Sequence, residues 1–200
     1  MLMALCAIAQ AVAGRAAANR ALTIDPAGSR AVIAVGKSGA FSFIAGHTHE
    51  VSGPIGGTLD LDPDDFARAR VRIEIDAAAL TVSAKGEPPE DVPKVQKMML
   101  SDQVLDVARH PTIVFQSTSI AVKTGAKQAA DLMVTGTLTL HGVTRPLTVP
   151  VHAVVTDAAV TAKGQFAVKQ TDYGMKPVSV AGVVAVKDSL SISVSITAGR

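Results

Sequence analysis

The stretch that decides the fold is residues 110–147, HPTIVFQSTSIAVKTGAKQAADLMVTGTLTLHGVTRPL. Its clearest alternation sets Leu132, Val134, Leu138 and Leu140 against Met133, Thr135, Thr137 and Thr139. A period of two places these sets on opposite faces of an extended strand. The dipeptide His141-Gly142 supplies a turn between two such runs. The stretch therefore predicts antiparallel strands, each with one dry face and one wet face.

The same period of two continues on both sides of this stretch. In residues 69–76, valine and isoleucine alternate with charged side chains, and residues 189–196 alternate serine with leucine, isoleucine and valine. Further strand candidates are residues 30–35, 55–61, 112–122, 147–155 and 160–168. These runs make about eight half-polar strands, which suits an all-β antiparallel barrel or sandwich. Periodicity alone does not separate the barrel from the sandwich.

Residues 88–107 break this pattern and predict a short helical insertion. Their apolar residues recur at helical spacing, and Pro93 suits a first helical turn, where its missing N–H costs nothing. Ser101-Asp102 is expected to cap a second short helix that His110-Pro111 ends. We expect this insertion to close or flank the sheet.

Composition excludes several classes of partner and activity. The 19 basic and 17 acidic residues leave a net charge of +2 without a basic cluster, so nucleic acid is not an expected partner. The sequence has no G-x-S-x-G motif, and acidic pairs such as Asp64-Asp65 fit turns and helix caps. Nothing in the sequence points to an enzyme.

Residues 1–20 are Ala-rich and apolar up to Gly14, and they contain Cys6, the chain's one cysteine. They are too short to span a bilayer, and small-x-small motifs at Ala11–Ala13 and Ala16–Ala18 are typical of signal-peptidase sites. We expect a signal peptide at 1–20, a single domain at 21–200 and a periplasmic or secreted protein. Because no Lys or Arg precedes the apolar run, a short buried or disordered helix is the alternative.

His47 and His49 form the most conspicuous polar pair. On a strand, residues two apart point the same way, so both imidazoles could meet one metal ion. Zinc would need a third ligand, for which His110, His141 and Glu50 are available, but no spacing requires them to converge. The alternative is that the histidines hydrogen-bond at the rim or floor of a cavity, with no metal bound.

Four segments in order resemble the YceI-like family of lipocalin-like, polyisoprenoid-binding proteins. Residues 110–118, HPTIVFQST, and 134–145, VTGTLTLHGVTR, match its "P-x-I-x-F-x-S-T" strand and "G-x-L-T-x-H-G-V-T" motif. FIAGH at 43–47 lies near the start, and TDYGM at 171–175 stands in place of a late "R-x-x-F/Y-G-I" element. The chain departs from the family where Gln170 and Thr171 replace the late arginine, and where ALTV at 79–82 falls short of an "S-I-x-T" pattern.

The resemblance covers about residues 24–197 and implies an antiparallel eight-stranded lipocalin-like β-barrel with an elongated cavity. The implied ligand is a polyisoprenoid, an isoprenoid quinone or a similar lipid, bound for storage, transport or stress protection. No further cofactor and no membrane-spanning segment in the mature chain are expected, and a homodimer stays open. Two other functions stay open: a metal-binding protein or metalloenzyme using His47 and His49, and a structural or interaction module whose barrel is filled.

Bulky and polar side chains near the cavity are the candidate ligand-binding residues. We expect Phe41, Phe43, Phe115 and Phe166 to line the tube, and His47, His49 or Tyr173 to hydrogen-bond a headgroup. Plain core packing is the alternative for each phenylalanine. Replacing His47 and His49 with alanine is expected to weaken lipid retention while leaving the fold intact.

Overall fold

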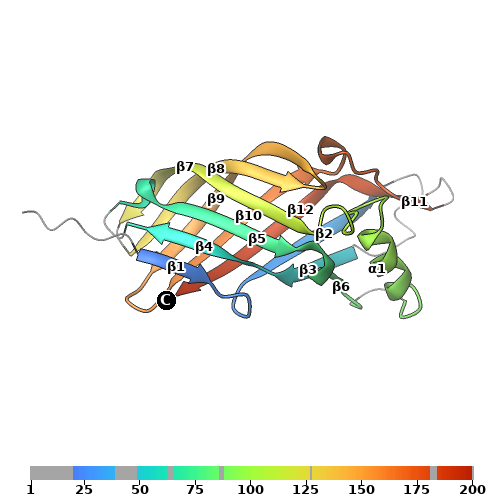
Figure 1. The fold of residues 1–200 in the computed structure, drawn as a ribbon, viewed down its shortest axis with the longest axis horizontal. Coiled ribbons are helices and arrows are strands. Elements are labelled where there is room, and N and C mark those ends of the chain that lie inside the picture. The colour runs from blue at the N-terminus through green and yellow to red at the C-terminus, as the bar shows by residue number, and fades with distance from the viewer. Residues whose placement is uncertain are drawn as a thin grey trace, which may run out of the picture.

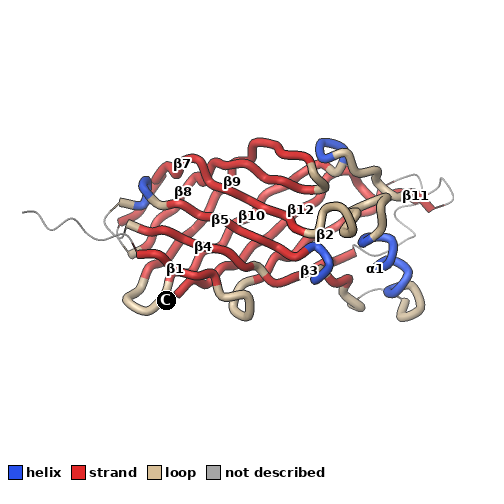
Figure 2. Tube along the Cα trace, viewed as in Figure 1, coloured by secondary structure: helices blue, strands red, loops and turns tan. Residues whose placement is uncertain are grey.

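The computed structural model describes residues 20–38, 49–62, 65–85, 88–126, 128–180 and 184–199. Its strands curl into an elongated tube, with α1 at one end (Figures 1 and 2). The strands are β1 (Arg20–Ile24), β2 (Arg30–Ser38), β3 (His49–Pro54), β4 (Gly56–Leu61), β5 (Arg70–Asp76), β6 (Thr81–Val82), β7 (Thr112–Ala126), β8 (Ala129–Leu140), β9 (Val143–Val155), β10 (Val160–Lys169), β11 (Ser179–Val180) and β12 (Val184–Gly199). The helix is α1 (Val92–Leu100), and the 3₁₀ turns are η1 (Phe66–Arg68), η2 (Ala77–Ala79) and η3 (Thr171–Tyr173).

The strands close into the antiparallel eight-stranded barrel that the resemblance implied. Their order is β1-β4-β5-β7-β8-β9-β10-β12, and β12 returns to β1 through the pairs Thr23↔Gly199 and Ile24↔Ala198. Further along, β12 pairs with β2, and β2 pairs with β3. Thus β1 and β2 together serve as one interrupted strand, and β3 and β4 as its neighbour. Closure gives each of these eight strands a hydrogen-bonded neighbour on both sides.

Ser29 holds the interruption between β1 and β2 against β12. Its hydroxyl donates to the Thr197 carbonyl at 3.2 Å and accepts from the Thr197 N–H at 2.9 Å. The preceding turn is closed by the Asp25 carboxylate, which accepts from the N–H groups of Ala27 and Gly28. These bonds satisfy backbone groups that a continuous ladder would otherwise pair.

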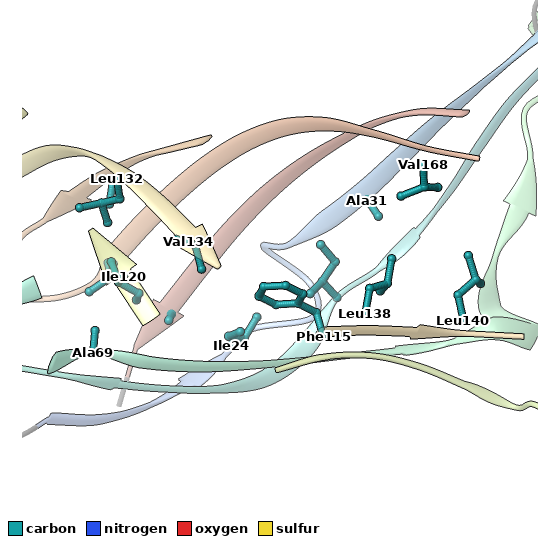
Figure 3. Close-up of a cluster of buried hydrophobic side chains, with 14 of the residues drawn as sticks. Ile24, Ala31, Ala69, Phe115, Ile120, Leu132, Val134, Leu138, Leu140 and Val168 are labelled. Atoms are coloured by element: carbon teal, nitrogen blue, oxygen red, sulfur yellow. The ribbon is translucent and has the colours of Figure 1, made fainter. Parts of the chain in front are cut away.

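The period of two places apolar side chains inside the barrel. In β8, every second residue from Ala130 to Leu140 is buried, and those between are more exposed. In β5, Val71 and Ile73 face the cavity, while Arg72 and Glu74 form an ion pair at 2.8 Å outside. Figure 3 shows buried side chains, Phe115, Leu138 and Leu140 among them, in the interior. The predicted dry and wet faces are confirmed for these strands.

The predicted helix forms as α1, but the prediction of a second short helix was wrong. Ser101 instead ends α1, because its N–H and hydroxyl both donate to the Met98 carbonyl, at 3.1 Å and 2.7 Å. Residues 102–105 form turns, and Asp106 has a positive φ of 47°, which a right-handed helix does not accommodate. Within the described residues, no helix combines the length and hydropathy that crossing a bilayer requires.

Gln96 fastens α1 to the barrel. Its side-chain amide donates to the Leu80 carbonyl and accepts from the Val82 N–H, both at 2.8 Å. The amide thus continues the hydrogen bonding of the short strand β6 in place of another strand. This contact keeps the helical insertion over one end of the tube (Figure 1).

Candidate functional site

The described residues enclose an apolar cavity of about 890 Å³ inside the barrel. Inward-facing residues of β5, β7, β8, β9, β10 and β12 form its wall, with Leu138, Val149 and Ile192 among them. Small-molecule sites usually measure roughly 300–1,000 Å³, so this cavity stands near the upper end of that range. It accounts for the rows of valine, isoleucine and leucine in the sequence, which line a space instead of filling it.

The helical insertion forms part of the same wall, a role that the sequence did not reveal. Val95 and Met99 of α1 line the cavity, and so do Val104 and Leu105 from the turns that follow. Phe66 of η1 also lines it, from the opposite end of the tube (Figure 2). The cavity therefore extends along much of the barrel.

Polar side chains are few along this wall. Among the described residues they are His49, Asp91, Lys94 and Gln170. Lys163 also borders the cavity, but it stands at an exposed position of β10, so its ammonium group is directed away from the interior. Asp91 and Lys94 form an exposed ion pair at 2.8 Å at the start of α1. The hydrogen bond that the Lys94 ammonium donates to Asp91 raises the pKa of Lys94, so this group stays charged near neutral pH. A ligand would meet a mainly apolar wall, with charge and amide groups near α1.

Phe115 and Phe166 both line the cavity, whereas their contact with a ligand stays a prediction. Phe115 lies opposite Ile73 on one neighbouring strand and Leu138 on the other. Its ring passes over Gly136, where an added Cβ would lie 2.7 Å from the ring's Cζ and 2.3 Å from the Gln116 carbonyl oxygen. The glycine therefore provides the space that this aromatic side chain occupies.

His49 also lines the cavity, at the start of β3, where it pairs with Val35 of β2. The remaining candidates from the N-terminal part of the sequence, Phe41, Phe43 and His47, lie outside the described residues. Their proposed roles therefore stay predictions.

Tyr173 is deeply buried in η3, with 3 % of its surface exposed, but is not among the described residues that line the cavity. Burial raises the pKa of its hydroxyl. Nearby Gln170 is 4 % exposed and does line the cavity. Its side-chain amide donates to the Lys187 carbonyl at 2.9 Å, which fixes its position in the wall. Sequence reasoning noted Gln170 only as a departure from the family pattern, yet an amide in that place is a candidate contact for a ligand.

The His47–His49 hypothesis stays a prediction because His47 lies outside the described residues, but three other side chains do come together. Among the described residues, His110 and His141 come together with Asp106, and ligand atoms of the three side chains lie within 4.8 Å of one another. This group does not include His49, and its three residues are not among the described lining residues. It forms a second polar cluster, separate from the cavity wall.

A family model described as "YceI-like domain" matches residues 22–198. The chain belongs to this family. The resemblance drawn from residues 110–147 is therefore confirmed.

Curated relatives of this YceI-like chain carry the name UPF0312 protein. The one from Shewanella denitrificans is 32% identical over 132 residues, which cover 66% of this chain and 61% of the relative. The one from Pseudomonas savastanoi pv. phaseolicola is 34% identical over 93 residues, which cover 46% and 42%. The matches thus span about half of the length of these relatives.

Solved structures show the same fold. The chain resembles Burkholderia cenocepacia BcnA with a TM-score of 0.67 and 20% identity, covering 87% of this chain and 98% of BcnA. It resembles a polyisoprenoid binding domain from Saccharophagus degradans, described as implicated in plant cell wall breakdown, with a TM-score of 0.62 and 13% identity, covering 90% and 98%. At these identities the likeness establishes the architecture.

Proposed function

We propose that this YceI-like barrel binds a long apolar amphiphile, a polyisoprenoid, an isoprenoid quinone or a similar lipid, and does not catalyse a reaction. The observation that carries the proposal is the 890 Å³ cavity, whose wall is formed mainly by aliphatic side chains and phenylalanine. A barrel filled by its own side chains, the structural-module alternative, would lack such a space. The name of the Saccharophagus degradans domain, a polyisoprenoid binding domain of the same fold, supports the same ligand class.

The size of the hydrophobic effect makes such a ligand reasonable. Each buried CH₂ contributes about 0.8 kcal/mol, so a chain of some twenty carbons offers on the order of 10 kcal/mol before association costs. Directional bonds are then needed only to orient the molecule. The described lining includes no serine, threonine or cysteine that could act as a nucleophile.

The distribution of polar groups indicates how the ligand is oriented. Gln170, His49 and the Asp91–Lys94 pair lie at one stretch of the wall, whereas Phe66 lines the far end. We expect the headgroup near α1 and the chain directed toward η1. Phe41, Phe43 and His47 are proposed to contribute to the tube and the headgroup contact, as is Phe166.

We further propose that the chain acts outside the cytoplasm, in the periplasm or after secretion, with residues 1–20 as its signal peptide. Storage, transport and stress protection of the lipid are the roles compatible with a binding barrel. The intact mass of the protein recovered from the periplasmic fraction of a bacterial host tests this proposal. Retention of residues 1–20 in that fraction would contradict it.

The test of ligand binding is native mass spectrometry of the full chain purified from bacteria. We expect a stoichiometric adduct that dissociates on denaturation, and organic extraction should release a lipid with a long isoprenoid or similar apolar chain. If the mass stays that of the bare chain after incubation with an isoprenoid quinone, the proposal is wrong. A metal-sized adduct that depends on His47 and His49 would favour the metal alternative.

A further inference from the structure

Asp106, His110 and His141 form a compact cluster beside the barrel wall. Asp106 and His110 belong to one turn, because the His110 N–H donates to the Asp106 carbonyl at 2.8 Å. His141 follows β8 in the turn to β9, and its ring lies against that of His110 with centroids 5.2 Å apart. Ligand atoms of the three side chains lie within 4.8 Å of one another.

The hydrogen bonding of His141 leaves one ring nitrogen available. Its Nδ1 lies 3.0 Å from the Tyr173 carbonyl oxygen, and a carbonyl can only accept, so Nδ1 carries the proton. In the neutral ring, Nε2 then holds the lone pair. This nitrogen is buried and has no hydrogen-bond partner. A metal-binding histidine is typically fixed in this way, with its other N–H donated to a carbonyl or carboxylate.

The carboxylate of Asp106, like the ring of His141, is held by a hydrogen bond to one of its two polar atoms. The Asp106 side chain is 4 % exposed, and Oδ2 accepts from both Nε and a terminal nitrogen of Arg109 at 2.5 Å. The guanidinium holds the carboxylate through this one oxygen, and Oδ1 takes no part in the ion pair. Such a contact to the second oxygen is the usual support of a carboxylate ligand.

The backbone around the cluster is also unusual. Asp106 (φ 47°) and His141 (φ 51°) are the positive-φ residues other than glycine in the described part of the chain. Next to them, a Cβ on Gly142 would lie 2.5 Å from Cε1 of His110, so only glycine admits that ring. Sparsely populated backbone conformations often concentrate at functional sites.

We propose that Asp106, His110 and His141 form a binding site for a divalent transition-metal ion, with Zn²⁺ as the expected ion. Two imidazoles and a carboxylate suit zinc in tetrahedral geometry, with a fourth position left for water. Tetrahedral ligand atoms around zinc lie on the order of 3.3 Å apart, so a small inward movement of the side chains completes the site. The ion would join the turn after α1 to the β8–β9 turn, independently of any lipid.

The test uses the full chain without a polyhistidine tag, stripped with chelator and titrated with ZnCl₂ by calorimetry. We expect one ion per chain, and an affinity at least about tenfold lower for Asp106→Asn, His110→Gln and His141→Gln. Asp106→Asn retains a side chain that tolerates a positive φ, so it should remain folded by circular dichroism. Bound Co²⁺ should give a visible absorption band that the same substitutions abolish.

Two controls separate this site from other histidines. His152 lies exposed on β9 against Asp131, at 2.7 Å, and His152→Gln should leave zinc binding unchanged. The same is expected for the double variant His47→Ala, His49→Ala. The proposal is overturned if the wild-type chain binds no zinc, if binding persists in His110→Gln/His141→Gln, or if either control abolishes it.

Discussion

Gly136 sets the space around Phe115 at the scale of single residues. Gly136→Ala would place a methyl group 2.3 Å from the Gln116 carbonyl oxygen and 2.7 Å from the Phe115 ring. Because a backbone atom cannot give way as a side chain does, we expect the free energy of unfolding to fall by about 1–3 kcal/mol. Urea denaturation measures this loss. Gly56→Ala is the matched control, since its Cβ would have no described neighbour nearer than 3.8 Å. Equal losses in both variants would refute this explanation.

Asp188 gives the fold a dependence on pH. Its carboxylate accepts from the N–H and hydroxyl of Thr171, at 2.9 Å and 2.8 Å, and these bonds lower the pKa of Asp188. A lowered pKa means that the stabilisation is complete above the ordinary value of about 3.9 and is lost as pH falls through the folded value. We expect Asp188→Asn to lower the melting temperature at pH 7 and to reduce its further fall on acidification. Asp102→Asn, in the exposed turn after α1, is the control. If wild type and Asp188→Asn lose the same stability between pH 7 and pH 3, Asp188 does not act this way.

Some residues of the candidate site could be predicted from the sequence, and others could not. Phe115 and Phe166 stand on alternating strands, so their inward direction follows from period two. The positions of Gln170 and of the cluster of Asp106, His110 and His141 are set by backbone turns and by the pairing of strands far apart in sequence. The local sequence pattern does not specify either. The pair Val114↔Thr139 brings the two residues before β7, His110 and Pro111, close to the turn after β8. If this strand pairing is continued past the ends of both strands, it predicts that His110 and His141 lie close together.

At the scale of elements, Gln96 holds the helical insertion in place. Gln96→Met keeps the size of the side chain but leaves the Val82 N–H and the Leu80 carbonyl without this partner. An unpaired, partly buried backbone group costs about 1–3 kcal/mol, so amide hydrogens of β6 and α1 should exchange about tenfold faster or more. Hydrogen–deuterium exchange over residues 77–100 measures this. Lys97→Met, on the exposed side of the same helix, should leave the exchange unchanged. Similar acceleration in both variants would contradict the proposed role of Gln96.

Two elements differ from the sequence prediction, for different physical reasons. β3, with the sequence HEVSGP, contains glycine and proline and has little intrinsic strand propensity. It is a strand because β2 pairs along it, from Val35↔His49 to Arg30↔Pro54. The second short helix does not form for a local reason, because Ser101 donates two hydrogen bonds to the Met98 carbonyl and so ends α1. Strands such as β8 and β12 were predictable because the alternation of apolar and polar side chains in their own sequence shows which face of the strand is buried.

At the scale of the molecule, the rows of apolar residues did not decide between a sandwich, a solid barrel and a hollow one. That choice depends on closure, which the chain achieves by pairing β1 with the end of β12, residues far apart in sequence. It also depends on whether side chains from opposite walls meet. In this barrel they leave a cavity of about 890 Å³.

The most direct test of the central claim, that this cavity holds a lipid, is the ligand occupancy of two variants on one strand. Ala162 of β10 lines the cavity, and Ala167 of the same strand is exposed. Ala162→Phe should fill part of the cavity and Ala167→Phe should not. Native mass spectrometry of both, purified from the same host and checked for folding by circular dichroism, measures occupancy. We predict that Ala162→Phe loses most of the lipid adduct while Ala167→Phe retains it at the wild-type level. Equal occupancy in the two folded variants would place the lipid outside the cavity and contradict the account.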